Sequence, residues 1–192
     1  MTDTYHNTSS IRAARLDDAE SLASLSRQLL VYEKSLNETM GDLTSWAASV
    51  VELRKQLLRP NNQFFVADKN GETIGYLKLV IHGLEASRTE IGTARWLIDR
   101  MERLARRFFN FLLRRPRPNV DAVGGYIAGV FVHPDARREN IGRALVAAAE
   151  SWLRAQGIAS AELHVLYVNQ GARRFWEEIG YEPLTLGMRK KL

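Results

Sequence analysis

The chain has 192 residues, of which 45% are hydrophobic and 26% are charged, a balance typical of one soluble globular domain. It contains no cysteine, which excludes disulfides, thiolate zinc sites and a cysteine nucleophile, and no apolar run approaches the roughly 18 residues that cross a bilayer. The formal net charge is +5, yet residues 88–117 alone hold nine arginines and three acids. The basicity is therefore local, which argues against a protein that coats nucleic acid.

The N-terminal part of the chain predicts one strand followed by two helices. Residues 11–14 form a short β-rich run, and Asp17 with Glu20 three residues later has capping-box spacing. Apolar residues then recur at helical spacing, at Leu22, Leu25, Leu29 and Tyr32. A second helix is predicted from Thr44 as its N-cap until Pro60, which forbids continuation. Its apolar face contains Trp46, Val50, Leu53 and Leu57.

The rest of the chain alternates strands with helices. Asn70-Gly71, between β-rich runs at 64–67 and 73–81, predicts a tight hairpin because Asn-Gly readily takes positive φ. The other predicted elements are a strand at 125–132, a helix at 141–156, a strand at 161–168, a helix at 170–179 and terminal strands at 181–186 and 188–192. Gly157 and Gly180 are predicted to end the two helices. The chain is thus predicted to be α/β, with a mixed sheet of the α+β kind.

An apolar strand leads directly into a polar loop and an Ala-rich helix at residues 130–144. The first amides of a helix have no partner within it, and with the positive end of the helix dipole they make a site for a pyrophosphate. Gly142 permits close approach of the backbone, and Arg137, Arg138 and Arg143 add positive charge. Taken alone, the segment is equally compatible with a solvated turn that carries stray arginines.

This segment resembles the acetyl-CoA motif of the GNAT superfamily of N-acetyltransferases, V-x-P-x-x-R/Q-x-x-G-x-G/A. Val132, Pro134, Arg137 and Gly142 stand in register with that motif. Residues 163–181 resemble the family signature L-x-V-x-x-x-N-x-x-A-x-x-F-Y-x-x-x-G-F/Y. Two motifs in the right order are far more specific than either one, and the N-terminal helices and the hairpin fit the same layout.

The resemblance implies the GNAT acyl-CoA N-acyltransferase fold over residues 1–192, with a helical insertion at 84–122 between the third and fourth strands. Strands 125–132 and 161–168 are then parallel neighbours that splay apart and open a slot for the pantetheine arm of acetyl-CoA. The backbone of strand residues Val130, Phe131 and Val132 bonds that arm like an added strand. Asn169 bonds the cofactor near its thiol end, a role compatible with N-capping the next helix.

The resemblance also assigns the pyrophosphate to the loop and the helix start, through the amides of residues 138–143. The expected cofactor contacts there are Arg137, Arg138, Glu139, Asn140, Ile141, Gly142, Arg143 and Ala144. Asn140 departs from the motif, which has glycine at this position. Because Asn tolerates a left-handed backbone better than most residues, the loop can keep its shape.

Two further departures concern the chemistry. Trp176 stands where the family often has a tyrosine that protonates the departing thiolate. Indole cannot act as that acid, so Trp176 is expected to pack against the cofactor or in the core. Ala128 and Gly129 stand where many members carry a carboxylate that deprotonates the attacking amine.

An attacking amine of pKa about 10 must lose a proton before it attacks, so a base is needed from elsewhere. Tyr126 and Tyr167 are the catalytic candidates, each with the alternative of ordinary packing on a strand. His133, His164 and Glu85 are further candidates. Catalysis would mostly consist of positioning the cofactor and the amine in one slot, in a direct transfer within a ternary complex.

The segment between the hairpin and the cofactor strand predicts a basic amphipathic helix. Ser87 and Glu90 have capping-box spacing, and Pro116 and Pro118 end the helix. Its apolar positions alternate steps of three and four, at Ile91, Ala94, Ile98, Met101, Ala105, Phe108 and Leu112. This stripe at 88–115 is expected to pack on the domain or on a second copy in a homodimer. A lid over the acceptor site, an anionic membrane contact and an RNA or acidic-protein contact are alternatives.

The sequence therefore predicts a cytoplasmic N-acetyltransferase that moves an acetyl group from acetyl-CoA to a primary amine of a small molecule or a protein. Metal chemistry is not expected, because the four histidines show no ligand spacing. A binding module that keeps acetyl-CoA as a regulatory ligand is the alternative, motivated by Trp176, Ala128 and Gly129. The identity of the acceptor amine stays open.

Overall fold

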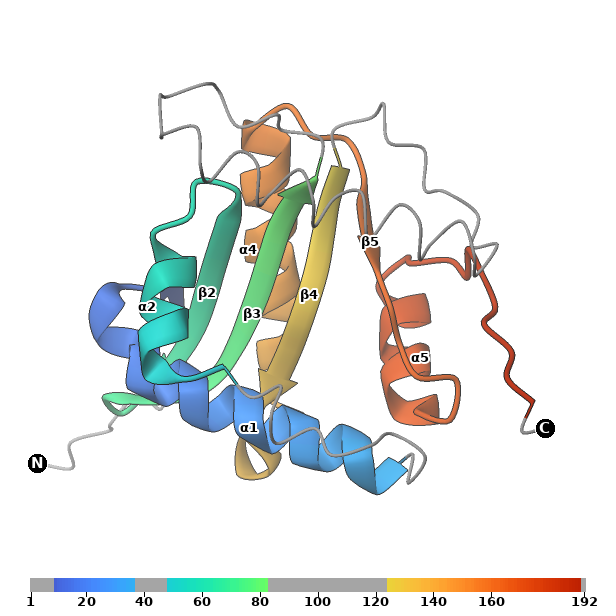
Figure 1. Ribbon diagram of the computed structural model, residues 1–192, viewed down its shortest axis with the longest axis horizontal. Helices are drawn as coiled ribbons and strands as arrows, with labels where there is room; N and C mark the ends of the chain where they lie inside the picture. The colour runs from blue at the N-terminus through green and yellow to red at the C-terminus, as the bar shows by residue number, and fades with distance from the viewer. Residues whose placement is uncertain (1–8, 37–47, 83–123, 191–192) are drawn as a thin grey trace, which may run out of the picture.

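A five-stranded sheet with the order β1-β2-β3-β4-β5 is the centre of the computed structural model, which describes residues 9–36, 48–82 and 124–190 (Figure 1). Its strands are β1 (Ser10–Ala13), β2 (Asn62–Lys69), β3 (Glu72–His82), β4 (Gly124–Val132) and β5 (Ala161–Leu163). The first three pairs are antiparallel, whereas β4 and β5 are parallel. The mixed sheet is thereby confirmed. Thr44, Trp46 and the predicted basic helix at 88–115 lie outside the described residues.

The hairpin of β2 and β3 forms where the Asn-Gly pair predicts it. Asn70 has φ 54° and Gly71 has φ 82°, and Lys69 pairs with Glu72 across the turn. Two consecutive positive φ values match the right-handed twist of the strands, and Asn and Gly accept them at the least steric cost. The hairpin turn therefore follows from local chemistry alone.

The described helices are α1 (Ala19–Leu36), α2 (Val50–Leu57), α4 (Ile141–Ala155) and α5 (Gln170–Glu178). Ser49 N-caps α2, because its hydroxyl accepts a hydrogen bond from the amide of Glu52 at 3.2 Å. Gly157 and Gly180 follow α4 and α5 with φ 74° and 94°, which confirms the predicted helix ends. In Figure 1, α1 and α2 cover one face of the sheet, α4 covers the other, and α5 lies beside β5.

Alternate strand residues feed two hydrophobic cores, one on each face of the sheet. On the α4 side, Leu77 and Leu145 are completely buried. On the opposite side, Val66 and Tyr76 pack with Leu22 of α1. Burying a side chain of this size stabilises the fold by about 1.5–3 kcal/mol, so both helical layers are fixed to the sheet.

The start of α1 differs from the predicted cap at Asp17. A 3-10 turn, η1 (Leu16–Asp18), precedes the helix, and Asp18 is buried where Asp17 is exposed. The Asp18 carboxylate accepts a hydrogen bond from the Arg15 amide at 2.6 Å. The prediction was wrong because two adjacent aspartates offer the same local chemistry, and only tertiary partners decide between them.

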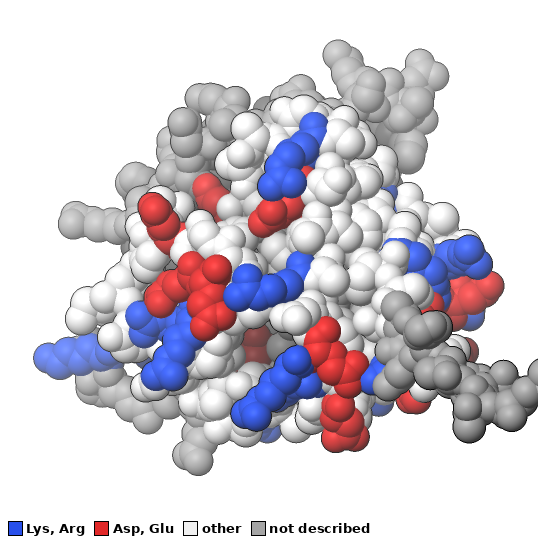
Figure 2. Space-filling view, turned by 180° about the vertical axis from the view of Figure 1, so that it is seen from behind, with Lys and Arg blue, Asp and Glu red and all other residues white. Residues whose placement is uncertain are grey.

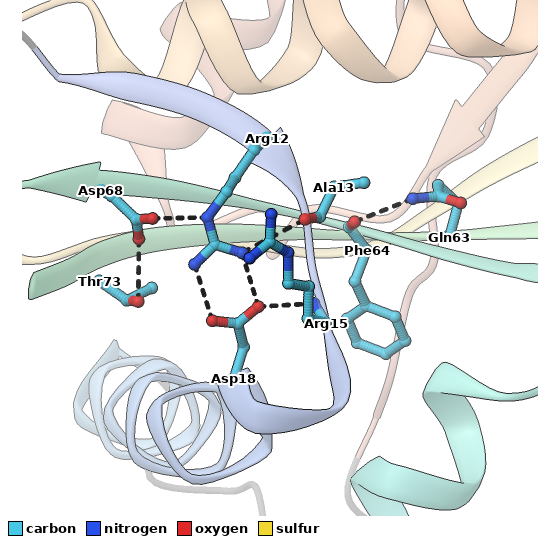
Figure 3. A network of polar contacts seen from close by, with 8 residues as sticks. All are labelled: Arg12, Ala13, Arg15, Asp18, Gln63, Phe64, Asp68 and Thr73. Atoms are coloured by element: carbon cyan, nitrogen blue, oxygen red, sulfur yellow. Dashed lines mark hydrogen bonds and ion pairs between the residues drawn. The ribbon is translucent and has the colours of Figure 1, made fainter. Parts of the chain in front are cut away.

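Those partners form a polar network that joins β1, η1, β2 and β3 (Figure 3). The Arg12 guanidinium donates two hydrogen bonds to Asp18 at 2.7 and 2.8 Å and a third to Asp68 at 2.6 Å. Thr73 donates to the other oxygen of Asp68 at 3.0 Å. Hydrogen bonding to Arg12 lowers the pKa of Asp18. The network anchors the first strand and the start of α1 to the hairpin.

The C-terminal part of the sheet is shorter than predicted. β5 ends at Leu163, not at residue 168, and residues 181–190 contain no strand. Leu184, Leu186 and Met188 alternate as in a strand but are 76%, 66% and 91% exposed. Alternation alone does not make a strand, because a strand also needs a neighbour whose backbone groups are free to pair.

Candidate active site

The edge of β4 that faces β5 is open over its second half. The two strands pair only at Gly125–Ala161, Tyr126–Glu162 and Ile127–Leu163. Beyond these pairs β4 continues to Val132, whereas the chain after β5 leaves the sheet. On its other edge, β4 stays paired with β3 up to Val132. Backbone groups on the open edge therefore have no β5 partner, and an extended molecule can bond there.

A β-bulge lies where the two strands separate. Lys78 and Leu79 are adjacent on β3 but pair with Gly129 and Ile127, so Ala128 is an extra residue on β4. A bulge bends its strand and increases the local twist. It coincides with the end of the β4–β5 ladder, which explains how one short parallel pair opens into a gap.

Of the expected pantetheine contacts, Val130, Phe131 and Val132 all lie on this open edge of β4. The side chains of these three residues pack in the two cores and are not available for a ligand. Phe131 is buried against the α1 and α2 layer, and Val130 and Val132 pack against the α4 core. Any contact with the pantetheine arm therefore comes from the backbone, as the resemblance implies.

The loop between β4 and α4 has two residues in the left-handed conformation. After the 3-10 turn η3 (Pro134–Ala136), Arg138 has φ 69°, and Asn140 has φ 61° and ψ 11°. Asn140 thus takes the left-handed conformation at the position where the family motif has glycine. Left-handed residues that alternate with other conformations in a turn curl the backbone so that its amides converge, an arrangement that suits an anion.

The amides of this loop and of the first helical turn are unpaired among the described residues. The first helical hydrogen bond runs from the Ala144 amide to the Asn140 carbonyl at 3.0 Å, and the Arg137 amide bonds Pro134 at 3.2 Å. Between them, the amides of residues 138–143 meet no acceptor in the described ranges. The positive end of the α4 dipole lies at the same place. Ala144 was expected among the cofactor contacts, but its amide is occupied within the helix.

The charged side chains of the loop have different partners. Arg137 donates to the Val132 carbonyl at 3.2 Å, and its guanidinium lies 5.4 Å from the ring centre of Tyr32. Arg143 pairs with Glu178 at 3.1 Å, and Glu139 pairs with Lys69 at 2.7 Å. Arg138 is exposed and forms no ion pair with any described residue. It is the loop cation that remains available for a phosphate.

Ile141 and Gly142 serve packing as well as the loop. The Ile141 side chain is 2% exposed and belongs to the α4 core. A Cβ on Gly142 would lie 3.4 Å from the Phe175 ring, so glycine lets the start of α4 approach α5 closely. Only the amides of these two residues are free for a ligand.

The start of α5 borders the gap on the side away from β4. The Asn169 side chain accepts a hydrogen bond from the Ala172 amide at 3.0 Å, which makes it the N-cap of α5. Its Oδ1 also lies 3.5 Å from the Tyr32 hydroxyl of α1. Tyr32 therefore reaches across the gap from one side to the other.

Trp176 lies in the core, one of the two places expected for it. It is 9% exposed and packs edge-to-face against Phe175 and Tyr181, with ring centres 5.1 and 5.0 Å away. Its contribution is hydrophobic packing of α5 against α4. No proton donor stands at this position of α5.

Comparison with known proteins decides the family. Residues 31–181 match the model of the acetyltransferase (GNAT) family. The chain belongs to the GNAT family. Among curated proteins, none matches this sequence.

Solved structures share the GNAT fold at low sequence identity. The tetramutant of the BH1408 protein from Bacillus halodurans superposes with a TM-score of 0.70 and 17% identity, over 95% of this chain and 99% of that one. The aminoglycoside acetyltransferase meta-AAC0020 from an uncultured soil metagenomic sample, solved with sisomicin, has a TM-score of 0.63 and 17% identity over 97% of each chain. The aminoglycoside N-acetyltransferase AAC(6')-Iy in complex with CoA has a TM-score of 0.61 and 15% identity over 100% of both chains.

In this GNAT protein, Tyr126 is a partly buried residue of β4 that pairs with Val80 of β3. Its hydroxyl lies 2.8 Å from Nδ1 of His164, and the centres of the Tyr126 and His82 rings are 5.4 Å apart. Burial raises the pKa of Tyr126, with a further contribution from the charge of Glu33. The structure thus joins two candidates, Tyr126 and His164, that lie 38 residues apart in the sequence.

The other catalytic candidates are not part of this cluster. Tyr167 is 66% exposed and stacks under the Arg173 guanidinium at 4.6 Å. His133 lies 3.6 Å from Asp135 beside η3. Glu85 lies outside the described residues. Tyr126 is therefore the candidate that the geometry favours.

One group near the gap has no counterpart among the sequence candidates. Glu33 lies in the last turns of α1, is partly buried, and has its pKa raised by burial. Its charge also raises the pKa of Tyr76. A carboxylate on the apolar face of a helix is a sequence signal, because Leu22, Leu29 and Glu33 share helical spacing.

The face of the molecule that lies behind the view of Figure 1 carries both basic and acidic side chains. In Figure 2, basic and acidic side chains are interspersed over the described residues instead of gathering into one patch.

Within the described ranges there is no group of three or more potential metal ligands. None of the helices placed by the structure is long and apolar enough to span a bilayer.

Proposed function

We propose that this GNAT acetyltransferase moves the acetyl group of acetyl-CoA to a primary amine by direct attack in a ternary complex. The observation that carries the proposal is the set of amides at residues 138–143, which meet no acceptor in the part of the chain that the structure describes, beside the open edge of β4. Together they offer a diphosphate site and an extended main-chain edge, which are the two parts that a CoA thioester requires.

In this proposal the residues divide the cofactor between them. The loop amides and the Arg138 guanidinium hold the pyrophosphate, because both present positive charge to it. The backbone of residues 130–132 bonds the pantetheine arm, and Asn169 lies near the thiol end. Acetyl-CoA supplies a thioester as the acyl donor. A free amide of β4 next to the thioester stabilises the oxyanion that develops on its carbonyl oxygen.

The amine acceptor approaches from the face that bears Tyr126 and His164. Their hydrogen bond holds the Tyr126 hydroxyl in place, and the face of the Tyr126 ring suits a cationic amine. The acceptor is a small molecule or an exposed amine of a protein. Sisomicin is one acceptor to test, because the similar enzyme meta-AAC0020 was solved with it.

A regulatory acetyl-CoA-binding module is the second candidate function. It is favoured by one specific observation, the absence of an acid or base at three positions that often carry them, since Trp176 is in the core and Ala128 and Gly129 have no ionisable group. Such a protein would bind acetyl-CoA through the same loop without turnover.

Thiol release separates the two functions. The protein is mixed with acetyl-CoA and with sisomicin, spermidine, lysine or a peptide with a free N-terminal alanine, and CoA release is followed. An enzyme releases thiol with at least one amine. Stabilisation by acetyl-CoA without release supports the regulatory module. A melting temperature that acetyl-CoA leaves unchanged contradicts both functions, because any ligand that binds only the folded state stabilises it.

A further inference from the structure

The last turns of α1 present three residues toward the gap between β4 and α5. Leu29, Tyr32 and Glu33 share one face of the helix, because they are three and four residues apart. Leu29 Cδ2 lies 3.6 Å from the place that a Cβ on Gly129 would take. Tyr32 reaches Asn169 at the far side of the gap. Glu33 lies on the same helix face, one turn beyond Leu29.

The helix face that carries Glu33 lies over the bulge of β4, because Leu29, one turn before Glu33, lies beside Gly129. The Tyr76 hydroxyl is 3.3 Å from the Cβ position at Gly129, and Glu33 acts electrostatically on both Tyr76 and Tyr126. These two tyrosines belong to neighbouring strands and flank the bulge. The α1 face that carries Glu33 therefore lies over the part of β4 where Ala128 and Gly129 offer no ionisable side chain.

Among the residues that the structure describes, the Glu33 carboxylate has no compensating cation. No described cation lies within ion-pair distance of it. The ionisable groups that face it are Tyr76 from β3 and Tyr126 from β4, the latter bonded to His164, while Arg137 stacks on the adjacent Tyr32. Glu52 of α2 pairs with Arg59, which follows the end of that helix. A partly buried carboxylate without a cation attracts an ammonium ion.

We propose that Glu33 binds the ammonium group of the acceptor and removes the proton that blocks its attack. This role depends on the proposed function, in which the pantetheine arm runs from the loop back along β4 and ends near Gly129. Burial raises the pKa of Glu33, which makes it a stronger base than an exposed carboxylate.

The proton transfer fits into a balanced reaction. Glu33 takes one proton from the ammonium, and the nitrogen lone pair then forms a C–N bond with the acetyl carbon. The C–S bond breaks, and CoA leaves as a thiolate. The second proton lost by the nitrogen reaches the thiolate through water, and Glu33 returns its own proton to solvent after the amide has left.

The test compares Glu33→Gln with Glu20→Gln, a change of an exposed glutamate in the first turn of the same helix. The acceptor is whichever amine of the panel the wild-type protein acetylates fastest. We expect Glu33→Gln to lower kcat/KM at pH 7 about 100-fold, within the usual range for loss of a general base. Glu20→Gln should keep the wild-type rate.

Two further readouts separate a base from a structural residue. Methoxyamine is neutral at pH 7 and needs no base, so Glu33→Gln should acetylate it at nearly the wild-type rate. The wild-type rate with an ordinary amine should fall as acid protonates Glu33, and this acidic limb should be missing in Glu33→Gln. Glu33→Asp keeps a carboxylate and should retain the limb with a lower rate, including if Glu33→Gln folds poorly.

The outcomes distinguish this role from the proposed function. If the wild-type protein releases no thiol with any amine, both the proposed function and the role of Glu33 are overturned. If the wild-type protein is active and Glu33→Gln keeps its rate and its acidic limb, only the role of Glu33 is overturned. An equal loss with methoxyamine and with the ordinary amine also contradicts the proton transfer.

Discussion

Asn140 and Arg138 give the cofactor loop its shape through their backbone conformations. A left-handed backbone costs most L residues roughly 1–2 kcal/mol, and Asn less, because its short side chain can bond locally. The family motif has glycine at position 140, and φ 61° there shows why glycine or asparagine is accepted. At Arg138, with φ 69°, no such preference exists, so this residue is kept in an unfavourable conformation by the loop around it.

Arg138→Gln tests the assignment of the phosphates. Removing the Arg138 guanidinium, which unlike those of Arg137 and Arg143 contacts no described side chain or carbonyl, should weaken acetyl-CoA binding about 10- to 100-fold, since a charge-assisted hydrogen bond contributes roughly 1.5–3 kcal/mol. Titration calorimetry with acetyl-CoA measures the change. Arg54→Gln, an exposed arginine on α2, is the matched control and should bind normally. Equal affinity of Arg138→Gln and wild type would place the pyrophosphate elsewhere.

Among the elements, those with local signals were predictable from the sequence. The Asn70-Gly71 turn, the helix after the cofactor loop and the glycines that end α4 and α5 all follow from neighbouring residues. The length of β5 could not be predicted in this way, because it depends on where β4 bends at Ala128. The predicted terminal strands were wrong for a related reason. Strand pairing is a property of two segments, and the alternation of one segment does not specify its partner.

The candidate site follows the same division. The loop, the open β4 edge and Asn169 were accessible from motifs that are continuous in the sequence. The contact of Tyr126 with His164 and the proximity of Glu33 to the bulge join residues far apart in the chain. Only the packing of α1 on the sheet brings Glu33 there, so its periodicity signalled an unusual residue without showing its partner.

The ion pair between Arg12 of β1 and Asp18 of η1 makes the free energy of unfolding depend on pH. Asp18 is 11% exposed in its side chain, and Arg12 lowers its pKa. Its contribution is complete above its unfolded pKa of about 3.9 and is lost as the pH falls through the lower folded pKa. Asp18→Asn should therefore reduce the free energy of unfolding at pH 7 by about 2 kcal/mol, and the deficit should shrink below about pH 4.

Urea unfolding between pH 3 and pH 7 measures this dependence. The matched control is Asp17→Asn, because Asp17 is the exposed neighbour of Asp18 in the same turn. It should unfold like the wild-type protein at pH 7. A constant difference between Asp18→Asn and wild type over the whole pH range would show that the ion pair with Arg12 is not its cause.

The two faces of the sheet have different roles in this protein. The α4 face is a continuous hydrophobic core, whereas the face of α1 and α2 also carries Tyr126, Lys78 and Glu33. The chain outside residues 88–117 is almost electrically neutral. The excess of arginine thus belongs to one segment and not to the cofactor fold.

Replacing residues 88–118 with a short Gly-Ser linker tests what that segment contributes. The proposed single domain, with this segment as an insertion, predicts that acetyl-CoA still raises the melting temperature, because the cofactor loop and β4 remain. We expect the acceptor range or the oligomeric state to change, as measured by thiol release and by light scattering. Unchanged behaviour in both respects would contradict a role for the segment in either.

Because the β4–β5 ladder ends early, one edge of the second half of β4 has no neighbouring strand. In the proposed function, the acyl donor lies along the free edge of β4 and forms the hydrogen bonds that a neighbouring strand would form. The substrate then completes the sheet. Recognition of its arm then rests on repeating peptide groups, which no side-chain substitution other than proline removes. Variation in sequence along this strand can therefore be wide while the seat for the thioester persists.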